Sequence, residues 1–77
     1  MQTPPIIAGR NEAAHYWHVG DYFLTAYPAP RGWHVRIRSR SSEVTEFIID
    51  GHFNTEADAT TWCSRMAVVF AEDQSDD

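Results

Sequence analysis

The sequence predicts an α+β fold: an antiparallel meander of three or four strands with one C-terminal helix packed on one face. Two observations support this prediction. Residues 33–40 alternate apolar and mostly basic side chains, which is the pattern of a half-buried antiparallel strand. Residues 53–70 repeat apolar side chains every three or four positions, which is the period of a helix lying on a surface. With 77 residues, the chain has room for one domain.

The helix is expected to begin at Thr55, whose hydroxyl can cap the amide of Asp58, with Asn54 as an alternative cap. Glu56 and Asp58 place negative charge in the first turn, where the helix dipole favours it. A helix of about sixteen residues is marginal alone in water, so it needs the sheet as a packing surface. The expected apolar stripe consists of Ala59, Trp62, Cys63, Met66, Val69 and Phe70.

Residues 1–71 are expected to form the single domain, with residues 1–9 as an extended arm. Two prolines exclude a helix in this arm, and a glycine ends it. Ile6 and Ile7 can dock on the core or on a partner. Residues 72–77, EDQSDD, are expected to form an acidic disordered tail.

The number of strands depends on Gly20 and Asp21. These two residues can form a hairpin turn between strands at 15–19 and 22–27, or a bulge inside one long strand. Before residue 15, a short helical turn capped by Asn11 is a further alternative.

A second hairpin is expected from the strand at 33–40 and a returning strand at 44–50. Matching their apolar faces requires Ile37 to lie opposite Phe47 or Thr45. A two-residue turn does not allow either pairing, so a connection of three or more residues, or a bulge, is expected. The expected core consists of Trp33, Val35, Ile37, Phe47, Ile49, Trp62, Met66, Val69 and Phe70.

The sheet face away from the helix carries the strongest functional signal in the sequence. Three arginines occupy alternate positions from Arg36 to Arg40, and Glu46 is expected to face one of the first two. Such a face fits an acidic protein or a polyanion, but it also fits a solvated surface whose charges are balanced across the hairpin. Tyr22 or Phe23 is expected on the same face, which gives it the composition of a protein interface. The candidate partner-binding residues are His34, Arg36, Arg38, Arg40, Val44, Glu46 and Ile48.

A second, smaller candidate surface lies on the helix. Val68 is opposite the expected apolar stripe, and Ala67 and Ala71 lie beside it. These three residues are therefore candidates for self-association in a homodimer.

The net charge of −5 is concentrated at the C-terminus. Four of the eleven acidic residues lie in the last six positions, so the other seven nearly balance the six arginines. A nearly neutral body attracts a polyanion weakly over long distances. Nucleic acid is therefore a possible partner but not the favoured one, and another protein or a nucleoprotein complex is preferred.

Cys63 is the only cysteine, and it lies on the expected apolar stripe. The sequence therefore predicts a reduced, buried thiol, which fits a reducing cytoplasm. No apolar run is long enough for a signal peptide or a membrane span, so a cytoplasmic location without membrane contact is expected.

The sequence predicts neither a metal site nor an active site. His15 and His18 are three residues apart, a spacing that places them on opposite faces of a strand. No Cys-x-x-Cys or His-x-x-x-His pair is present, and no glycine-rich elbow surrounds a serine. We therefore expect no bound metal, no cofactor and no catalytic activity.

Two segments, GWHVRIRSR and EVTEFIIDGHFNTEADATTW, combine a basic hairpin with an immediate helix that carries a tryptophan. In size, charge and layout the chain resembles small phage and mobile-element proteins of the anti-CRISPR type. This resemblance implies a non-enzymatic inhibitor that occupies a surface of a larger protein or nucleoprotein complex. The same segments resemble the arm-type DNA-binding domains of tyrosine-recombinase integrases, which implies a sheet-face DNA binder as the alternative. A structural homodimer is the third hypothesis.

Overall fold

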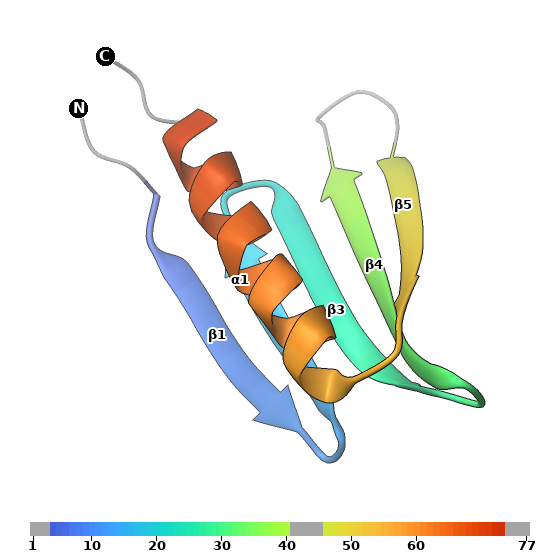
Figure 1. The fold of residues 1–77 in the computed structure, drawn as a ribbon. Helices are drawn as coiled ribbons and strands as arrows, with labels where there is room; N and C mark the ends of the chain where they lie inside the picture. The colour runs from blue at the N-terminus through green and yellow to red at the C-terminus, as the bar shows by residue number, and fades with distance from the viewer. Residues whose placement is uncertain (1–3, 41–45, 74–77) are drawn as a thin grey trace.

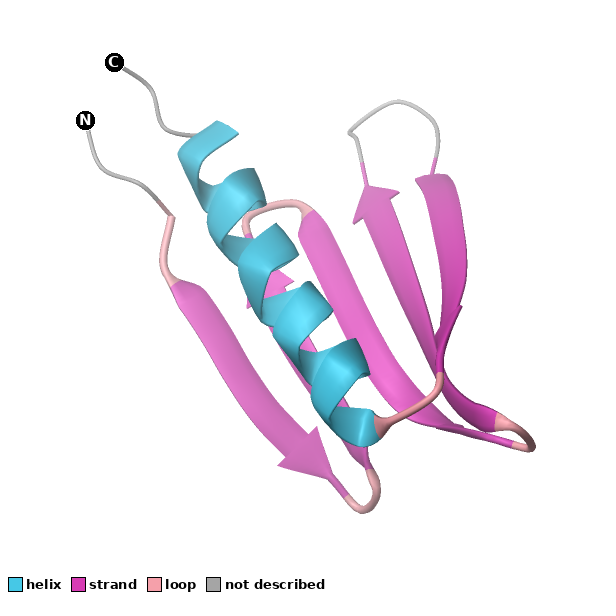
Figure 2. Cartoon of the chain, in the orientation of Figure 1, coloured by secondary structure: helices cyan, strands magenta, loops and turns pink. Residues whose placement is uncertain are grey.

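The computed structural model describes residues 4–40 and 46–73, which form one five-stranded antiparallel sheet and one helix (Figure 1). The strands follow one another in the sheet in chain order, and the helix lies on one face (Figure 2). The α+β fold with one C-terminal helix is confirmed, but the sheet has five strands rather than three or four. The elements are β1 (Ile6–Asn11), β2 (Ala14–Val19), β3 (Tyr22–Ala29), β4 (Gly32–Arg40), β5 (Glu46–Phe53) and α1 (Glu56–Asp73).

The additional strand is β1, which was expected to be an extended arm. It pairs with β2 along its whole length as an edge strand. Gly9 lies against the ring of Tyr16, and a Cβ at this position would collide with that ring. Gly9 therefore makes room for an aromatic ring over β1 instead of ending the strand. Asn11 pairs with Ala14 across a two-residue turn, so the alternative of a helical turn capped by Asn11 is wrong.

Gly20 and Asp21 form the turn between β2 and β3. Val19 lies opposite Tyr22, so the two residues between them connect adjacent strands of a hairpin. The hairpin interpretation is thus confirmed, and the alternative of a bulge inside one long strand is wrong. Two-residue loops of this kind match the twist of the strands they join.

The β4–β5 hairpin pairs in a different register from the expected one. Ile37 lies opposite Ile49 rather than either expected partner, and Glu46 lies opposite Arg40 rather than one of the preceding arginines. β4 ends at Arg40 and β5 begins at Glu46, so the strands are more than two residues apart in the chain, as expected. Residues 41–45 themselves lie outside the described residues. A shift of two residues keeps every side chain on its own face, so alternation alone does not select between these registers.

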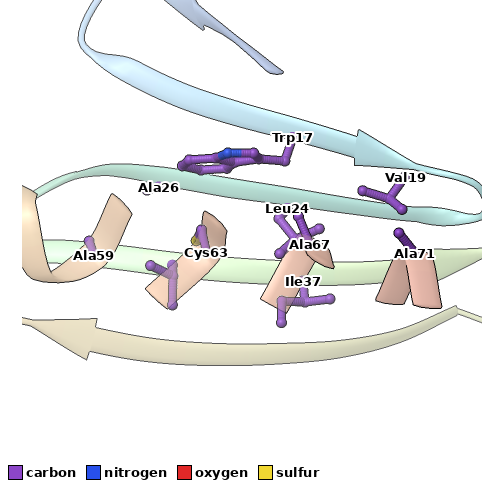
Figure 3. Packing of buried hydrophobic residues seen from close by; sticks show 10 residues of the cluster. Trp17, Val19, Leu24, Ala26, Ile37, Ala59, Cys63, Ala67 and Ala71 are labelled. Atoms are coloured by element: carbon purple, nitrogen blue, oxygen red, sulfur yellow. The ribbon is translucent and has the colours of Figure 1, made fainter. Parts of the chain in front are cut away.

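The core lies between α1 and the strands β2, β3 and β4 (Figure 3). A stripe of small side chains on α1 faces the sheet, and it meets larger side chains there. Small side chains let the helix backbone approach the sheet closely, so the sheet side chains fill the space between the two layers. The buried residues are Ala59, Cys63, Ala67 and Ala71 on the helix, and Trp17, Val19, Leu24, Ala26, Val35 and Ile37 on the sheet.

The helix is rotated relative to the expected stripe. Val69, expected in the core, is 50% exposed. The large aromatic residues pack beside the buried stripe and are only partly buried. The ring of Phe70 stacks on Tyr22 with centroids 4.1 Å apart, and the ring of Trp62 lies 5.7 Å from that of Phe53. These contacts pack α1 against Tyr22 on β3 and Phe53 on β5.

Thr55 caps α1 as expected. The amide of Asp58 donates to Oγ1 of Thr55 over 3.1 Å, and the amide of Ala59 donates to the Thr55 carbonyl oxygen over 3.1 Å. The helix continues to Asp73, so the first two residues of the expected acidic tail belong to it. The rest of that tail, residues 74–77, lies outside the described residues.

Replacing Thr55 with alanine removes the hydroxyl that satisfies the Asp58 amide. We expect the Thr55→Ala variant to lose about 1 kcal/mol of unfolding free energy in urea denaturation. Thr61→Ala is the matched control, because Thr61 is exposed within the helix and alanine favours a helix. Equal losses in the two variants would show that the cap does not stabilise α1.

Cys63 is a free, buried cysteine, as predicted. Burial raises the pKa of its thiol to about 12 from 9.0, because the thiolate would lose its hydration. At pH 8 the thiolate fraction is therefore about a thousandfold lower than in the unfolded chain. Since the folded-state pKa is the higher one, this thiol lowers the unfolding free energy only as the pH rises above about 9.

We expect Cys63 to react slowly with Ellman's reagent at pH 8 in the native protein. The rate should rise steeply with urea, in parallel with the population of open molecules, since only opening exposes the thiolate. A free-cysteine peptide of the same local sequence provides the reference rate. A native-state rate close to that of the peptide would contradict the burial of Cys63.

Candidate functional site

The candidate site is the sheet face opposite α1, which we call the outer face. Directly paired residues in an antiparallel sheet share a face, so the registers show which side chains belong to it. No element within residues 4–40 and 46–73 covers the outer face; the only helix lies on the other side (Figure 2). Its described side chains include Ile7, Tyr16, His18, Phe23, Thr25, Tyr27, Ala29, His34, Arg36, Arg38, Asp50 and His52.

Aromatic rings gather in the middle of the outer face. Phe23 on β3 is 40% exposed and lies between two rings of β2. The ring of Tyr16 stacks against it at 6.3 Å, and the ring of His18 meets it edge-on at 5.8 Å. Ile7 on β1, opposite His18, is 55% exposed. We call the rings of Tyr16, His18 and Phe23, together with the adjoining side chain of Ile7, the ring cluster.

The charged side chains of the outer face centre on Asp50. Nε of Arg36 donates to Oδ1 of Asp50 over 3.1 Å, and Nε2 of His34 lies 3.6 Å from the same oxygen. The hydrogen bond to Asp50, and then its charge, raise the pKa of Arg36. The charge of Arg36 is thus balanced by a carboxylate across the hairpin. Such balance is what the alternative of a solvated surface with paired charges predicts for this residue. The outer face is therefore not a plain basic stripe.

The predicted partner-binding residues fall into three groups. His34, Arg36 and Arg38 share the outer face, and Arg38 lies opposite Phe23. For Arg40, Glu46 and Ile48 the structure describes the backbone pairing, with Arg40 opposite Glu46 and Ile48 opposite Arg38. Val44 lies outside the described residues.

Of the ring cluster, only Phe23 is expected from the sequence, as an alternative to Tyr22. The structure places Phe23 on the outer face and Tyr22 on the helix side, where it stacks on Phe70. A signal was present in β2, where Tyr16 and His18 alternate with the buried Trp17 and Val19. Read with a period of two, that segment places both rings on the face away from the helix.

The expected self-association surface on α1 is wrong in two of its three residues. Ala67 and Ala71 are 1% and 5% exposed, because they belong to the stripe that contacts the sheet. Val68 is exposed, as expected, and its exposed neighbour is Val69. No continuous surface of Ala67, Val68 and Ala71 is available to a second copy.

The two histidines of β2, His15 and His18, lie on different faces of the sheet. His15 lies on the helix side, where Nε2 is 2.7 Å from Oε2 of Glu56 and its ring is 6.2 Å from Trp17 and 6.0 Å from Trp33. His18 lies on the outer face, so the two are on opposite faces as predicted.

Among residues 4–40 and 46–73, histidine, cysteine and carboxylate side chains form no cluster of three suited to a metal ion. In the same residues, no helix has the length and apolar character needed to cross a membrane.

Comparisons with protein-family models, with curated proteins and with solved structures return no match to this chain. The chemistry of the outer face is therefore the basis for proposing a function.

Proposed function

We propose that this chain is a non-enzymatic binding protein that uses its outer face to occupy a surface of a larger protein or nucleoprotein complex. The observation that carries the proposal is the exposed ring cluster on a sheet face that no described element covers. Aromatic side chains beside arginine are enriched in the buried centres of protein interfaces. The more specific proposal of a phage- or mobile-element-encoded inhibitor is supported by the sequence resemblance alone.

The balance of charge favours a protein partner over duplex DNA. Arg36 is engaged by Asp50, and a DNA-binding face would need its arginines available for phosphate. In the ring cluster, by contrast, Phe23 and Ile7 present apolar surface to water. Burial of this surface by a partner lowers the free energy of the complex.

The test is affinity capture with the tagged full chain, followed by measured affinities for each partner recovered. Phe23→Ala should weaken the binding of a genuine partner by about 2 kcal/mol, or roughly thirtyfold in Kd, since a central aromatic side chain is a typical hot spot. Val69→Ala is the matched control, because Val69 is exposed on α1 and remote from the outer face. A partner that binds Phe23→Ala and Arg38→Ala as tightly as the wild type would refute the proposal for this face.

A salt titration with duplex DNA tests the DNA-binding alternative. Binding through arginine–phosphate contacts would weaken log-linearly with salt, and Arg38→Ala would reduce the slope by about one. We expect no measurable duplex binding even at low salt. Steep, salt-dependent binding would replace the protein-binding proposal with the DNA-binding one.

A homodimer through β1 is the second candidate, and a separate observation favours it. β1 is an edge strand with Ile6 and Ile7 exposed on its two faces, and an edge strand offers unpaired backbone groups to a second chain. Two copies of β1 can pair antiparallel about a twofold axis. Light scattering should then give a mass above 8.8 kDa that Ile6→Lys, but not Val69→Lys, reduces to that of the monomer. A monomer at all concentrations would exclude this candidate.

A further inference from the structure

A hollow opens on the outer face where the β3–β4 hairpin meets the end of β5. Its volume is about 560 Å³, within the range of small-ligand sites. It is lined by Ala29, Pro30, Arg31, His34 and His52. Every polar side chain of this lining can donate a hydrogen bond, and no carboxylate is among them.

The donors come from two neighbouring strands and from the turn that precedes the first of them. His34 and His52 lie directly opposite each other on β4 and β5, and Arg31 lies in the turn that joins β3 to β4. Within the described part of the chain, Arg31 and His52 have no hydrogen-bond or ion-pair partner. Among the described side chains of this face, Asp50 is the carboxylate beside the hollow; its Oδ1 lies 3.6 Å from Nε2 of His34, and its charge is already engaged by Arg36.

The backbone holds the hairpin against the end of β5. Gly32 has φ of 138°, and its Cα is so close to the Phe53 carbonyl oxygen that an added Cβ would lie 2.5 Å from it. This contact joins the turn that carries Arg31 to the strand that carries His52. The ring of Tyr27 lies 5.4 Å from that of His34 and limits the orientations open to it. The donors are thus presented by a fixed backbone.

We infer that this hollow binds an anionic oxygen group, a carboxylate or a phosphate, presented by the partner of the outer face. The planar fork of Arg31 matches two oxygens of such a group, and the ring N–H groups of the histidines can donate to the same oxygens or, in a phosphate, to a third one. The inference rests on the proposed function in one respect: it names the protein partner as the molecule that presents the anionic group. Its test uses small anions alone, so it can fail while the ring cluster still binds a protein.

A second hollow, between α1 and the end of β5, provides the contrast. It is lined by both Asp58 and Arg65, together with Phe53, Ala57, Thr61 and Trp62. Asp58 lines this second hollow itself and has no ion-pair partner within the described residues, whereas Asp50 is paired with Arg36. The unpaired carboxylate repels an anion, so this hollow should not bind one. Arg65 is exposed and has no ion-pair partner within the described residues, which makes Arg65→Ala the matched control for Arg31→Ala.

The experiment is an NMR titration of the isotope-labelled full chain with inorganic phosphate at constant ionic strength. We expect saturable shifts of the His34 and His52 ring signals and of the Arg31 Nε–Hε signal, with Kd of about 1–10 mM. Arg31→Ala should raise this Kd at least tenfold, and Arg65→Ala should leave it unchanged. Arg31→Lys keeps the charge without the fork and should raise Kd by about threefold.

A parallel titration with acetate identifies the source of the group. Tighter binding of phosphate indicates a phosphorylated partner, and equal or tighter binding of acetate indicates a carboxylate side chain. The inference is overturned if the shifts rise linearly without saturation, if they spread equally over all arginines, or if Arg31→Ala and Arg31→Lys titrate like the wild type. Loss of partner binding in Phe23→Ala tests the ring cluster separately and does not depend on these outcomes.

Discussion

Leu24→Ala is expected to lower the free energy of unfolding by about 2–5 kcal/mol. Leu24 is fully buried in the middle of the sheet, opposite Trp17 on β2 and Ile37 on β4. The small side chains of α1 that lie above it cannot move inward to fill the cavity, because their backbone is already close to the sheet. A domain of this length has about 3–5 kcal/mol of stability in total, so a large share of the variant should be unfolded at 25 °C.

Urea denaturation followed by tryptophan fluorescence measures this loss. Phe23→Ala is the matched control, since Phe23 is the preceding residue on the same strand but points to the outer face and is 40% exposed. We expect a loss below about 1 kcal/mol for Phe23→Ala. Similar losses in the two variants would mean that the two faces of β3 are wrongly assigned.

The rotation of α1 shows what the sequence could and could not determine. The helical period and the cap at Thr55 were sufficient to predict the helix and its start. The expected stripe is partly wrong, because Val69 is exposed and Trp62 packs only at the edge of the core, whereas Ala67 and Ala71 are buried. Close packing of a helix on a twisted sheet instead favours the smallest side chains at the centre, with large ones at the sides. The hydrophobicity of the residues alone does not show which of them are small enough to lie at that centre.

The sheet was predictable wherever a strand alternates cleanly, as β4 does, and both Val35 and Ile37 are buried as expected. The expected pairing of Ile37 failed because two registers place the same residues on the same faces, and only the length of the connection separates them. β1 was missed for a different reason. Gly9 argues against a strand in a single sequence, and its role becomes clear only beside Tyr16 from the next strand.

For the candidate site, the sequence predicted which side chains share the outer face but only part of the chemistry of that face. His34, Arg36 and Arg38 do share the outer face. The balance of Arg36 by Asp50 and the cluster of rings around Phe23 depend on cross-strand neighbours, which a strand pattern does not specify without its register. The hollow at Arg31 depends on three segments that meet only in the folded chain.

Gly32→Ala should be nearly as damaging as the loss of Leu24, although Gly32 lies at the end of a strand. Its φ of 138° is a conformation that residues with a Cβ rarely adopt, and the added methyl would lie 2.5 Å from the Phe53 carbonyl oxygen. The colliding atom belongs to the backbone, so the hairpin or the end of β5 must move. We expect a loss of about 2–4 kcal/mol in urea denaturation.

Gly51→Ala is the control for this substitution. Gly51 also lies near the end of β5, but an added Cβ would meet only the Val35 side chain, at 3.3 Å, and its φ is not in the left-handed region. A loss below about 1.5 kcal/mol is therefore expected. If Gly32→Ala folds stably at low temperature, the displaced hairpin should still separate Arg31 from His52 and weaken phosphate binding, whereas Gly51→Ala should bind phosphate normally. Normal phosphate binding in a folded Gly32→Ala variant would show that the close contact with Phe53 does not position the donors of the hollow.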